Sequence, residues 1–145
     1  MGKQVSDVMT PGVQTVRLSD SAATAARLMR DNDVGSLPVV GEDGAPVGVI
    51  TDRDLAVRLV ADRRDPNETR VEELYSRELV TVAPEESLDE ALQRMAEHKV
   101  RRLPVVDDGR LVGMLAQADI ALEESAKKAG ELLEQVSEPT LAARV

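Results

Sequence analysis

The sequence of 145 residues has no cysteine, no phenylalanine and no tryptophan, and Tyr75 is its only aromatic residue. Without cysteine the chain can form neither a disulfide nor a cysteine-based metal site, and it has no thiol nucleophile. Proteins that bind single-stranded nucleic acids usually stack the bases on several aromatic side chains, so this class is disfavoured. The core must be built from aliphatic side chains.

Positive charge is also scarce, because 18 lysines and arginines stand against 27 aspartates and glutamates, giving a formal net charge of −9. Such a field repels nucleic acids and anionic membranes, and we expect neither as a partner. No apolar run approaches the ~20 residues that a membrane span needs, and the first residues carry no apolar signal core. With 42% hydrophobic and 31% charged residues, the composition is typical of a globular domain, and we expect a cytoplasmic location.

The residue types that catalysis needs do not occur in a recognisable arrangement. His98 is the only histidine, and no second metal ligand lies at helical spacing from it. There is no Ser–His or Cys–His pattern and no P-loop. We therefore expect no enzyme activity, no metal site and no tightly bound cofactor.

Most of the chain consists of two copies of one unit, a pattern that decides the fold. The segment Leu-Pro-Val-Val at 37–40 recurs at 103–106, an offset of 66 residues. After the turn that follows, Gly48 matches Gly113 with an offset of 65, because the first copy has one extra turn residue. Surface turns tolerate such a change easily.

Each copy is predicted to contain a helical turn, a brief strand, a helix, two strands joined by a turn, and a second helix. The first helices carry apolar residues at i, i+3, i+4 and i+7, and the later strands are almost continuously apolar. The expected ranges in the first copy are 5–9, 13–16, 21–32, 37–40, 47–50 and 52–61. Those in the second copy are 71–74, 79–82, 87–99, 103–106, 111–115 and 117 onward.

One such unit is too small to bury its own sheet, so the two copies should pack face to face. We predict an α+β (α/β) fold of two β-α-β-β-α units related by pseudo-twofold symmetry. The expected boundaries are 3–64 and 70–122 for the units, 65–69 for the linker, and 123–145 for an amphipathic helix and tail. The apolar stripe of that helix could pack on the body or on a second subunit, and 137–145 should be loosely ordered.

Thr51 and Asp54 stand where a strand is predicted to end and a helix to begin. They could hold a vicinal diol, because a carboxylate accepts hydrogen bonds from two adjacent hydroxyls. They could equally form a capping box without any ligand. Gly48 would let a ligand or a neighbouring backbone approach closely. In the second copy Ala116 replaces the threonine while Asp119 keeps the acid, so the two places should not do the same job.

The repeated Leu-Pro-Val-Val, the acidic turn and the Gly-Val-Ile-Thr-Asp-Arg-Asp run resemble a tandem pair of cystathionine-β-synthase (CBS) domains, known as a Bateman module. The resemblance covers residues 3–122, and its narrower likeness is to stress-response members of actinobacteria. It implies an adenosine-containing ligand (AMP, ADP, ATP, S-adenosylmethionine or NAD) in the cleft between the copies. It implies that Thr51 and Asp54 hold the ribose, with Asp119 in the equivalent place of a second site that Ala116 impairs.

The same resemblance implies an adenine pocket lined by the first strand and by residues before the Pro-Val-Val strand. For the Thr51 site these residues would be Val13, Thr15, Val34, Leu37 and Pro38. Phosphates need positive charge, and Arg101 and Arg102 stand where copy one has Gly35 and Ser36. Arg53 is a third candidate. These guanidiniums could instead be solvated or paired with surface acids.

The leading interpretation is a regulatory module that binds an adenosine-containing ligand, and the family also implies a homodimer formed through the helices. The alternative is a structural or protein-interaction CBS pair whose pocket is vestigial. Neither the effector protein nor the arrangement of subunits follows from the sequence.

Overall fold

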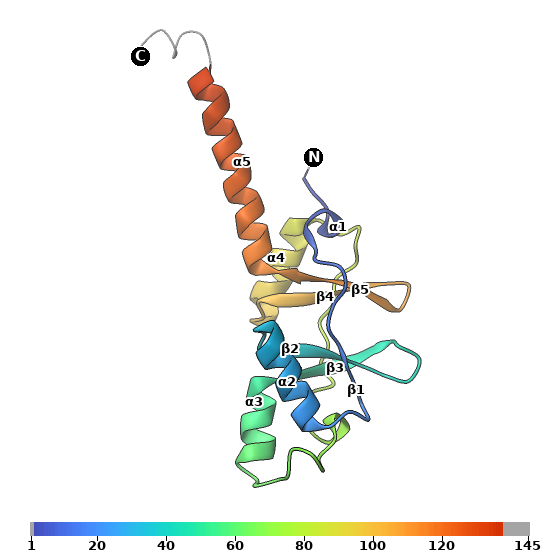
Figure 1. Ribbon diagram of the computed structural model, residues 1–145. Coiled ribbons are helices and arrows are strands. Elements are labelled where there is room, and N and C mark those ends of the chain that lie inside the picture. The colour runs from blue at the N-terminus through green and yellow to red at the C-terminus, as the bar shows by residue number, and fades with distance from the viewer. Residues whose placement is uncertain (1, 138–145) are drawn as a thin grey trace.

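The computed structural model describes residues 2–137, which form two α+β units stacked one on the other (Figure 1). The first part of the chain contains α1 (Val5–Val8), β1 (Val16–Arg17), α2 (Ala22–Asn32), β2 (Ser36–Val40) and β3 (Pro46–Thr51). It ends with α3 (Asp52–Asp54), which continues as the π-helical η1 (Leu55–Val60). The second part contains η2 (Val71–Glu73), α4 (Leu88–His98), β4 (Arg102–Asp107), β5 (Arg110–Ala116) and α5 (Gln117–Ser137).

The two central helices begin and end in the same way, which confirms the repeat at the level of single hydrogen bonds. The Ser21 side chain caps α2 by accepting a hydrogen bond from the Thr24 amide. In the same way, the Ser87 side chain caps α4 by accepting a hydrogen bond from the Glu90 amide. Both helices end at a residue in the left-handed region, with φ of 52° at Asp33 and 55° at Lys99. The predicted helices 21–32 and 87–99 are therefore confirmed to within one residue at each end.

The first unit has a three-stranded sheet in which β2 pairs with β1 in parallel and with β3 antiparallel. In the second unit β4 pairs with β5, and the predicted strand at 79–82 is reduced to one parallel bridge between Val82 and Val105. The predicted strand at 13–16 is likewise only Val16–Arg17. In both copies the pairing of this segment is thus limited to one or two residues, and the chain that precedes it packs on the opposite unit.

The segment that leads into each unit crosses over and packs on the other unit's sheet. Val5 is buried in the core that includes Val82 and Leu115, whereas Val71 is buried with Val16 and Ile50. The packing cores therefore differ from the sequence copies 3–64 and 70–122, because the apolar lead-in residues are exchanged. This exchange ties the two units together with buried aliphatic contacts.

Gly48 and Gly113 make the crossing possible. A Cβ atom at Gly48 would lie 2.2 Å from the Ser76 carbonyl oxygen, and one at Gly113 would lie 2.7 Å from Met9 Sδ. Of the two roles expected for Gly48, the structure therefore shows the close approach of a neighbouring backbone. The next residue of the same strand, Val49 in β3, forms an antiparallel bridge with Ser76.

The last helix, α5, begins at Gln117 and is continuous through Ser137, so the expected second helix of the unit and the amphipathic helix are one element. Its first turns contact β5, α1 and α4, and the rest projects away from the body (Figure 1). Leu122, Leu132 and Leu133 are 69%, 61% and 65% exposed. No helix in the described part is long and apolar enough to cross a membrane. The expectation of loose order for 137–145 concerns residues that, after Ser137, lie outside the described range.

Candidate functional site

Two cavities lie between the units, and the internal repeat relates one to the other. The first, which we call the Thr51 cavity, has a volume of about 470 Å³ and contains Thr51, Asp52 and Arg53. The second, the Asp119 cavity, has a volume of about 350 Å³ and contains Ala116, Ala118 and Asp119. Both volumes fall in the range of small-molecule sites.

Thr51 and Asp54 form a closed capping box at the start of α3. The Asp54 amide donates to Thr51 Oγ1 at 3.0 Å, and the Thr51 amide donates to Asp54 Oδ2 at 2.9 Å. Asp54 is only 9% exposed, and its other carboxylate oxygen lies 3.7 Å from the Arg58 guanidinium. Thr51 lines the cavity, whereas Asp54 is not among its lining residues. The capping interpretation therefore describes this conformation. Asp54 would have to move toward the cavity before it could bind a diol.

All three candidate arginines line the Thr51 cavity: Arg53 from unit 1, and Arg101 and Arg102 from unit 2. Lys99 adds a fourth cation, and Asp52 and Glu78 are the acids of the same wall. The ion pairs found among residues 2–137 involve other arginines and lysines. The cavity therefore gathers cationic groups on a chain whose net charge is −9.

The apolar wall differs from the one expected, because the first strands have changed places. Val13, Val34 and Leu37 line the Asp119 cavity, and Pro38 lines both cavities. The apolar residues of the Thr51 cavity include the repeat partners of Val13, Val34 and Pro38, with further members from the facing strands. They are Pro38, Val49, Leu79, Val80, Val100, Pro104 and Met114. The offset of 66 could have identified Leu79 and Val100, but only once the crossing was known.

Family comparison follows the two sequence copies. The CBS domain family matches residues 5–61 and 71–125. The chain belongs to the CBS domain family. CBS domain-containing protein YhcV of Bacillus subtilis is 45% identical over 134 residues, covering 92% of this chain and 94% of the relative. Hypoxic response protein 1 of Mycobacterium tuberculosis is 40% identical over 115 residues, covering 79% and 80%.

Solved structures of CBS domain pairs share the fold. The CBS domain pair of protein MJ0100, in complex with 5′-methylthioadenosine and S-adenosyl-L-methionine, has a TM-score of 0.76 at 28% identity and covers 88% of this chain and 99% of its own. CBSX2 in complex with AMP has a TM-score of 0.76 at 31% identity, with coverage of 88% and 99%. Among the residues that the structure describes here, no group of three metal-ligating side chains could hold a metal ion.

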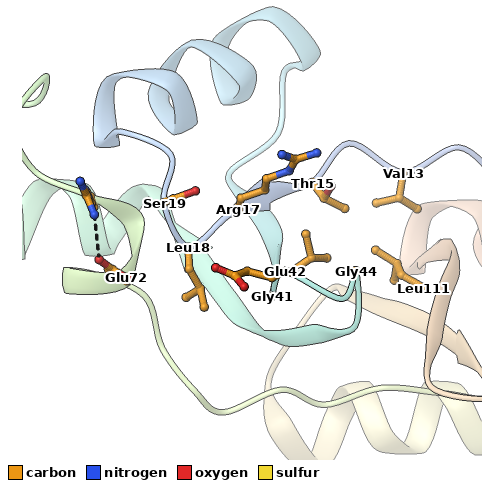
Figure 2. Close-up of a pocket in the computed structure, with 12 residues that line it drawn as sticks. Val13, Thr15, Arg17, Leu18, Ser19, Gly41, Glu42, Gly44, Glu72 and Leu111 are labelled. Carbon is orange, nitrogen blue, oxygen red and sulfur yellow. Dashed lines mark ion pairs between the residues drawn. The ribbon is translucent and has the colours of Figure 1, made fainter.

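A third cavity of about 850 Å³ is lined mainly by residues of the first CBS unit, together with Leu111 of the second. It contains Val13 and Thr15, which the family resemblance placed in the adenine pocket. Figure 2 shows Thr15 and Arg17 on one wall and Glu42 on the turn between β2 and β3. Arg70 and Glu72 form an ion pair of 3.7 Å at its edge. Thr15 and Thr51 therefore line different cavities, and the structure does not bring them together in one pocket.

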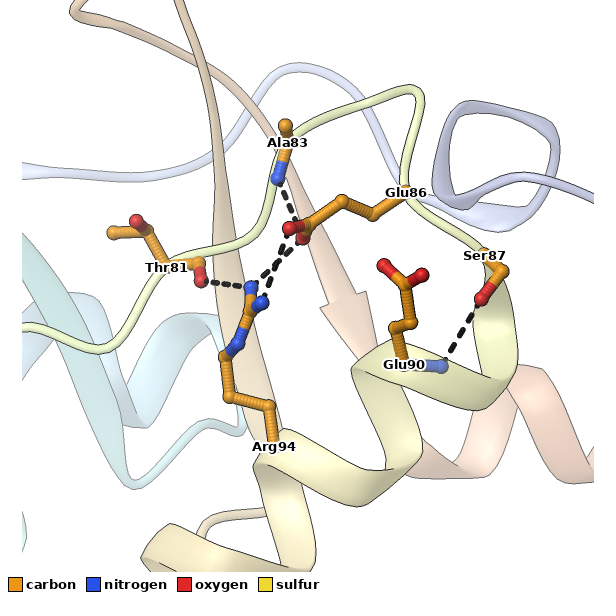
Figure 3. Close-up of polar contacts among 6 residues, drawn as sticks. All are labelled: Thr81, Ala83, Glu86, Ser87, Glu90 and Arg94. Carbon is orange, nitrogen blue, oxygen red and sulfur yellow. Dashed lines mark hydrogen bonds and ion pairs between the residues drawn. The ribbon is translucent and has the colours of Figure 1, made fainter.

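A polar strut supports the segment that walls the Thr51 cavity (Figure 3). Arg94 donates to the Thr81 carbonyl oxygen at 2.8 Å and to both Glu86 carboxylate oxygens at 2.7 and 3.0 Å. The Ala83 amide also donates to Glu86. The hydrogen bond from Arg94 holds the pKa of Glu86 below its usual value. The first copy has Leu28 in place of Arg94, so this support belongs to the second CBS unit alone.

Proposed function

We propose that this CBS pair is a regulatory module that binds an adenosine-containing ligand in the Thr51 cavity. The observation that carries the proposal is the composition of that cavity, whose lining combines apolar side chains with Thr51 and four cations. An aromatic base fits apolar side chains, and a phosphate fits guanidiniums, which bind it through paired donors. AMP, ADP, ATP, S-adenosylmethionine and NAD are the candidates, and AMP fits the charges most simply.

The position of the cavity supports a regulatory role rather than a catalytic one. Thr51 and Arg53 come from the first CBS unit, whereas Leu79, Val80 and Arg101 come from the second. A ligand that touches both units favours whichever relative packing it binds more tightly, by no more than its difference in affinity. Leu79 and Val80 follow Ser76, which bridges Val49, so such a change would reach the crossing segments.

Calorimetric titration with AMP, ATP, S-adenosylmethionine and NAD tests this proposal. We expect the Arg101→Ala and Arg102→Ala double variant to lose at least about 10-fold in affinity for AMP, the effect of losing charge-assisted hydrogen bonds. Arg110→Ala is the matched control, because Arg110 is exposed and lies outside the three cavities described above. Equal affinities in all three proteins would overturn the assignment of the arginines. Asp54→Asn tests the ribose role in the same way.

The alternative is a protein-interaction module with a vestigial pocket. The closed Thr51–Asp54 capping box and the exposed leucines of α5 favour it. It predicts no thermal shift with any adenosine ligand, together with loss of a partner or of a dimer when residues 122–145 are deleted. A cytoplasmic location and the absence of catalytic activity stay predictions under either function.

We also propose that the module is a homodimer that buries the exposed apolar side chains of its second helices. Val57 is 50% exposed, Val60 is 70% exposed, and Leu122 occupies the position equivalent to Val57. A solution mass of twice 15.7 kDa is expected, and Val57→Glu with Leu122→Glu should reduce it to one chain. The control, Leu132→Glu with Leu133→Glu, should leave the dimer intact. If only the control dissociates, the distal part of α5 is the interface instead.

A further inference from the structure

The third cavity, which we call the Arg17 cavity, has no part in the proposed function, and its charges differ from those of the Thr51 cavity. Four cations and two acids line the Thr51 cavity, which suits an anion. The Arg17 cavity is lined by two arginines, Arg17 and Arg70, and by two glutamates, Glu42 and Glu72. Because these charges sum to zero, its complement is a ligand without net charge that carries groups of both signs.

One cation and one anion of this cavity have no partner among the described side chains. Arg70 and Glu72 lie 3.7 Å apart and offset each other. Arg17 and Glu42 are exposed, and their guanidinium and carboxylate groups take part in none of the hydrogen bonds or ion pairs found among residues 2–133. They stand on different walls of the cavity (Figure 2). A ligand between these walls could therefore meet Arg17 with a carboxylate and Glu42 with an ammonium group.

The free cation belongs to the first CBS unit alone. The Asp20 carboxylate accepts a hydrogen bond from the Arg17 amide at 2.9 Å, just as the Glu86 carboxylate accepts one from the Ala83 amide at 3.1 Å. Ala83 is therefore the structural equivalent of Arg17. In the second unit the nearby guanidinium, that of Arg94, is bound to Glu86. The first unit instead presents its guanidinium to a cavity, which is a difference between two copies of one unit that packing does not require.

The rest of the lining suits an aliphatic group between the two charges. The hydroxyl residues Thr15 and Ser19 line the cavity together with four aliphatic side chains, which are Val13, Leu18, Val40 and Leu111. Leu111 comes from the second CBS unit, so a ligand here would contact both units. The volume of about 850 Å³ lies within the range of small-molecule sites, and it leaves room for a ligand longer than one amino acid.

We infer that the Arg17 cavity is a ligand site for a zwitterion with an aliphatic side chain, which is the chemistry of a free amino acid and of a short peptide. Arg17 binds the carboxylate through paired donors, Glu42 accepts hydrogen bonds from the ammonium group, and the aliphatic residues cover the side chain. The site does not depend on a nucleotide in the Thr51 cavity, so the two proposals stand or fail separately.

Calorimetric titration of the full chain with L-leucine and with trileucine tests the inference, and the tighter of the two identifies the free amino acid or the peptide as the source. Arg17→Ala and Glu42→Gln should each weaken that binding at least about 10-fold. Arg77→Ala and Glu85→Gln are the matched controls, because both residues are exposed and lie outside the three cavities. The inference is overturned if neither probe binds the wild type, or if either cavity variant binds as the wild type does.

Changes to the ligand provide a second test on the unaltered protein. Isocaproate is leucine without its ammonium group, and isoamylamine is leucine without its carboxylate; for the peptide, acetylation and amidation of trileucine remove the same charges. Each should bind at least about 10-fold more weakly than the parent compound, and equal binding overturns the inference. Arg101→Ala should leave binding of the zwitterion unchanged. Loss in that variant would place the zwitterion in the Thr51 cavity and overturn the inference, whereas its effect on AMP bears on the proposed function alone.

Discussion

The Arg58 guanidinium donates a hydrogen bond of 2.8 Å to the carbonyl oxygen of Leu74, and so ties η1 of the first CBS unit to the segment that opens the second. The equivalent position of the second unit is Glu123, which pairs with Lys3 in the segment that opens the first. Equivalent positions in the two units therefore bind the crossing segment that leads into the other unit. The side chain at this position is a cation, Arg58, in the first unit and an anion, Glu123, in the second. The Arg58 guanidinium also lies 3.7 Å from the carboxylate of Asp54, the acid that forms the capping box with Thr51.

Arg58→Ala should lower the free energy of unfolding by about 1–2 kcal/mol, because a buried carbonyl loses a charged donor. The Arg58 side chain is 52% exposed, which places the effect toward the lower end. Urea denaturation followed by circular dichroism measures it. Arg77→Ala, at an exposed position, is the control and should change stability by less than about 0.5 kcal/mol. Equal losses in both variants would mean that the tie contributes nothing.

The Arg94–Glu86 strut should give the second unit a stability that depends on pH. The pKa of Glu86 is lowered in the folded chain, so the pair stabilises the fold above the pKa of the unfolded glutamate, about 4.3. That contribution is lost as the pH falls through the lower, folded value. Glu86→Gln should therefore cost about 1–2 kcal/mol at pH 7 and make stability less dependent on pH below about 4.5.

Glu85→Gln is the matched control, because Glu85 is the exposed neighbour of Glu86. Melting curves collected between pH 3 and pH 7 should coincide for this control and the wild type. If the stability of Glu86→Gln depends on pH as strongly as that of the wild type, carboxylates other than Glu86 cause the loss of stability in acid. Since these contacts support the segment directly after Leu79 and Val80, the same variant should also weaken AMP binding.

The glycines at the two crossings should respond differently to an added methyl group. At Gly48 a Cβ would meet the Ser76 carbonyl oxygen at 2.2 Å and the Tyr75 ring at 2.7 Å. At Gly113 the nearest atom is Met9 Sδ, at the flexible end of a side chain, with the Thr10 carbonyl oxygen at 3.0 Å. Gly48→Ala should therefore cost about 3 kcal/mol and Gly113→Ala about 1 kcal/mol, the range that overpacking spans.

Gly130→Ala is the control for these glycines, because nothing lies within 4 Å of its added Cβ atom in α5. It should stabilise the helix by about 0.5–1 kcal/mol through propensity alone. Thermal melts of the three variants measure the order of their stabilities. If Gly48→Ala is no worse than Gly113→Ala, the backbone of 75–76 moves more readily than its hydrogen bonds to Val49 indicate.

The elements of each unit could be predicted from sequence because they depend on local signals. Ser21 and Ser87 cap helices, and the turn glycines Gly44 and Gly109 have φ of 82° and 76°. The exchange of lead-in segments could not be predicted, because Val5 and Val71 are equally apolar whichever sheet they cover. That one contact decides which first strand faces Thr51. The sequence therefore grouped Val13 and Val34 with Thr51, whereas both residues line the Asp119 cavity; which of these residues bind a ligand stays a prediction.

Arg102 is the one cation that lines both cavities, and it provides the last prediction. Arg102→Ala should weaken AMP binding about 10-fold, because a phosphate in the Thr51 cavity loses one guanidinium. Adenosine has no phosphate for Arg102 to bind, so it should bind about as tightly as before. Parallel titrations of both ligands measure the split, with Arg110→Ala as the control. If adenosine loses as much affinity as AMP, Arg102 acts on a part of the ligand other than the phosphate, and its assigned role is wrong.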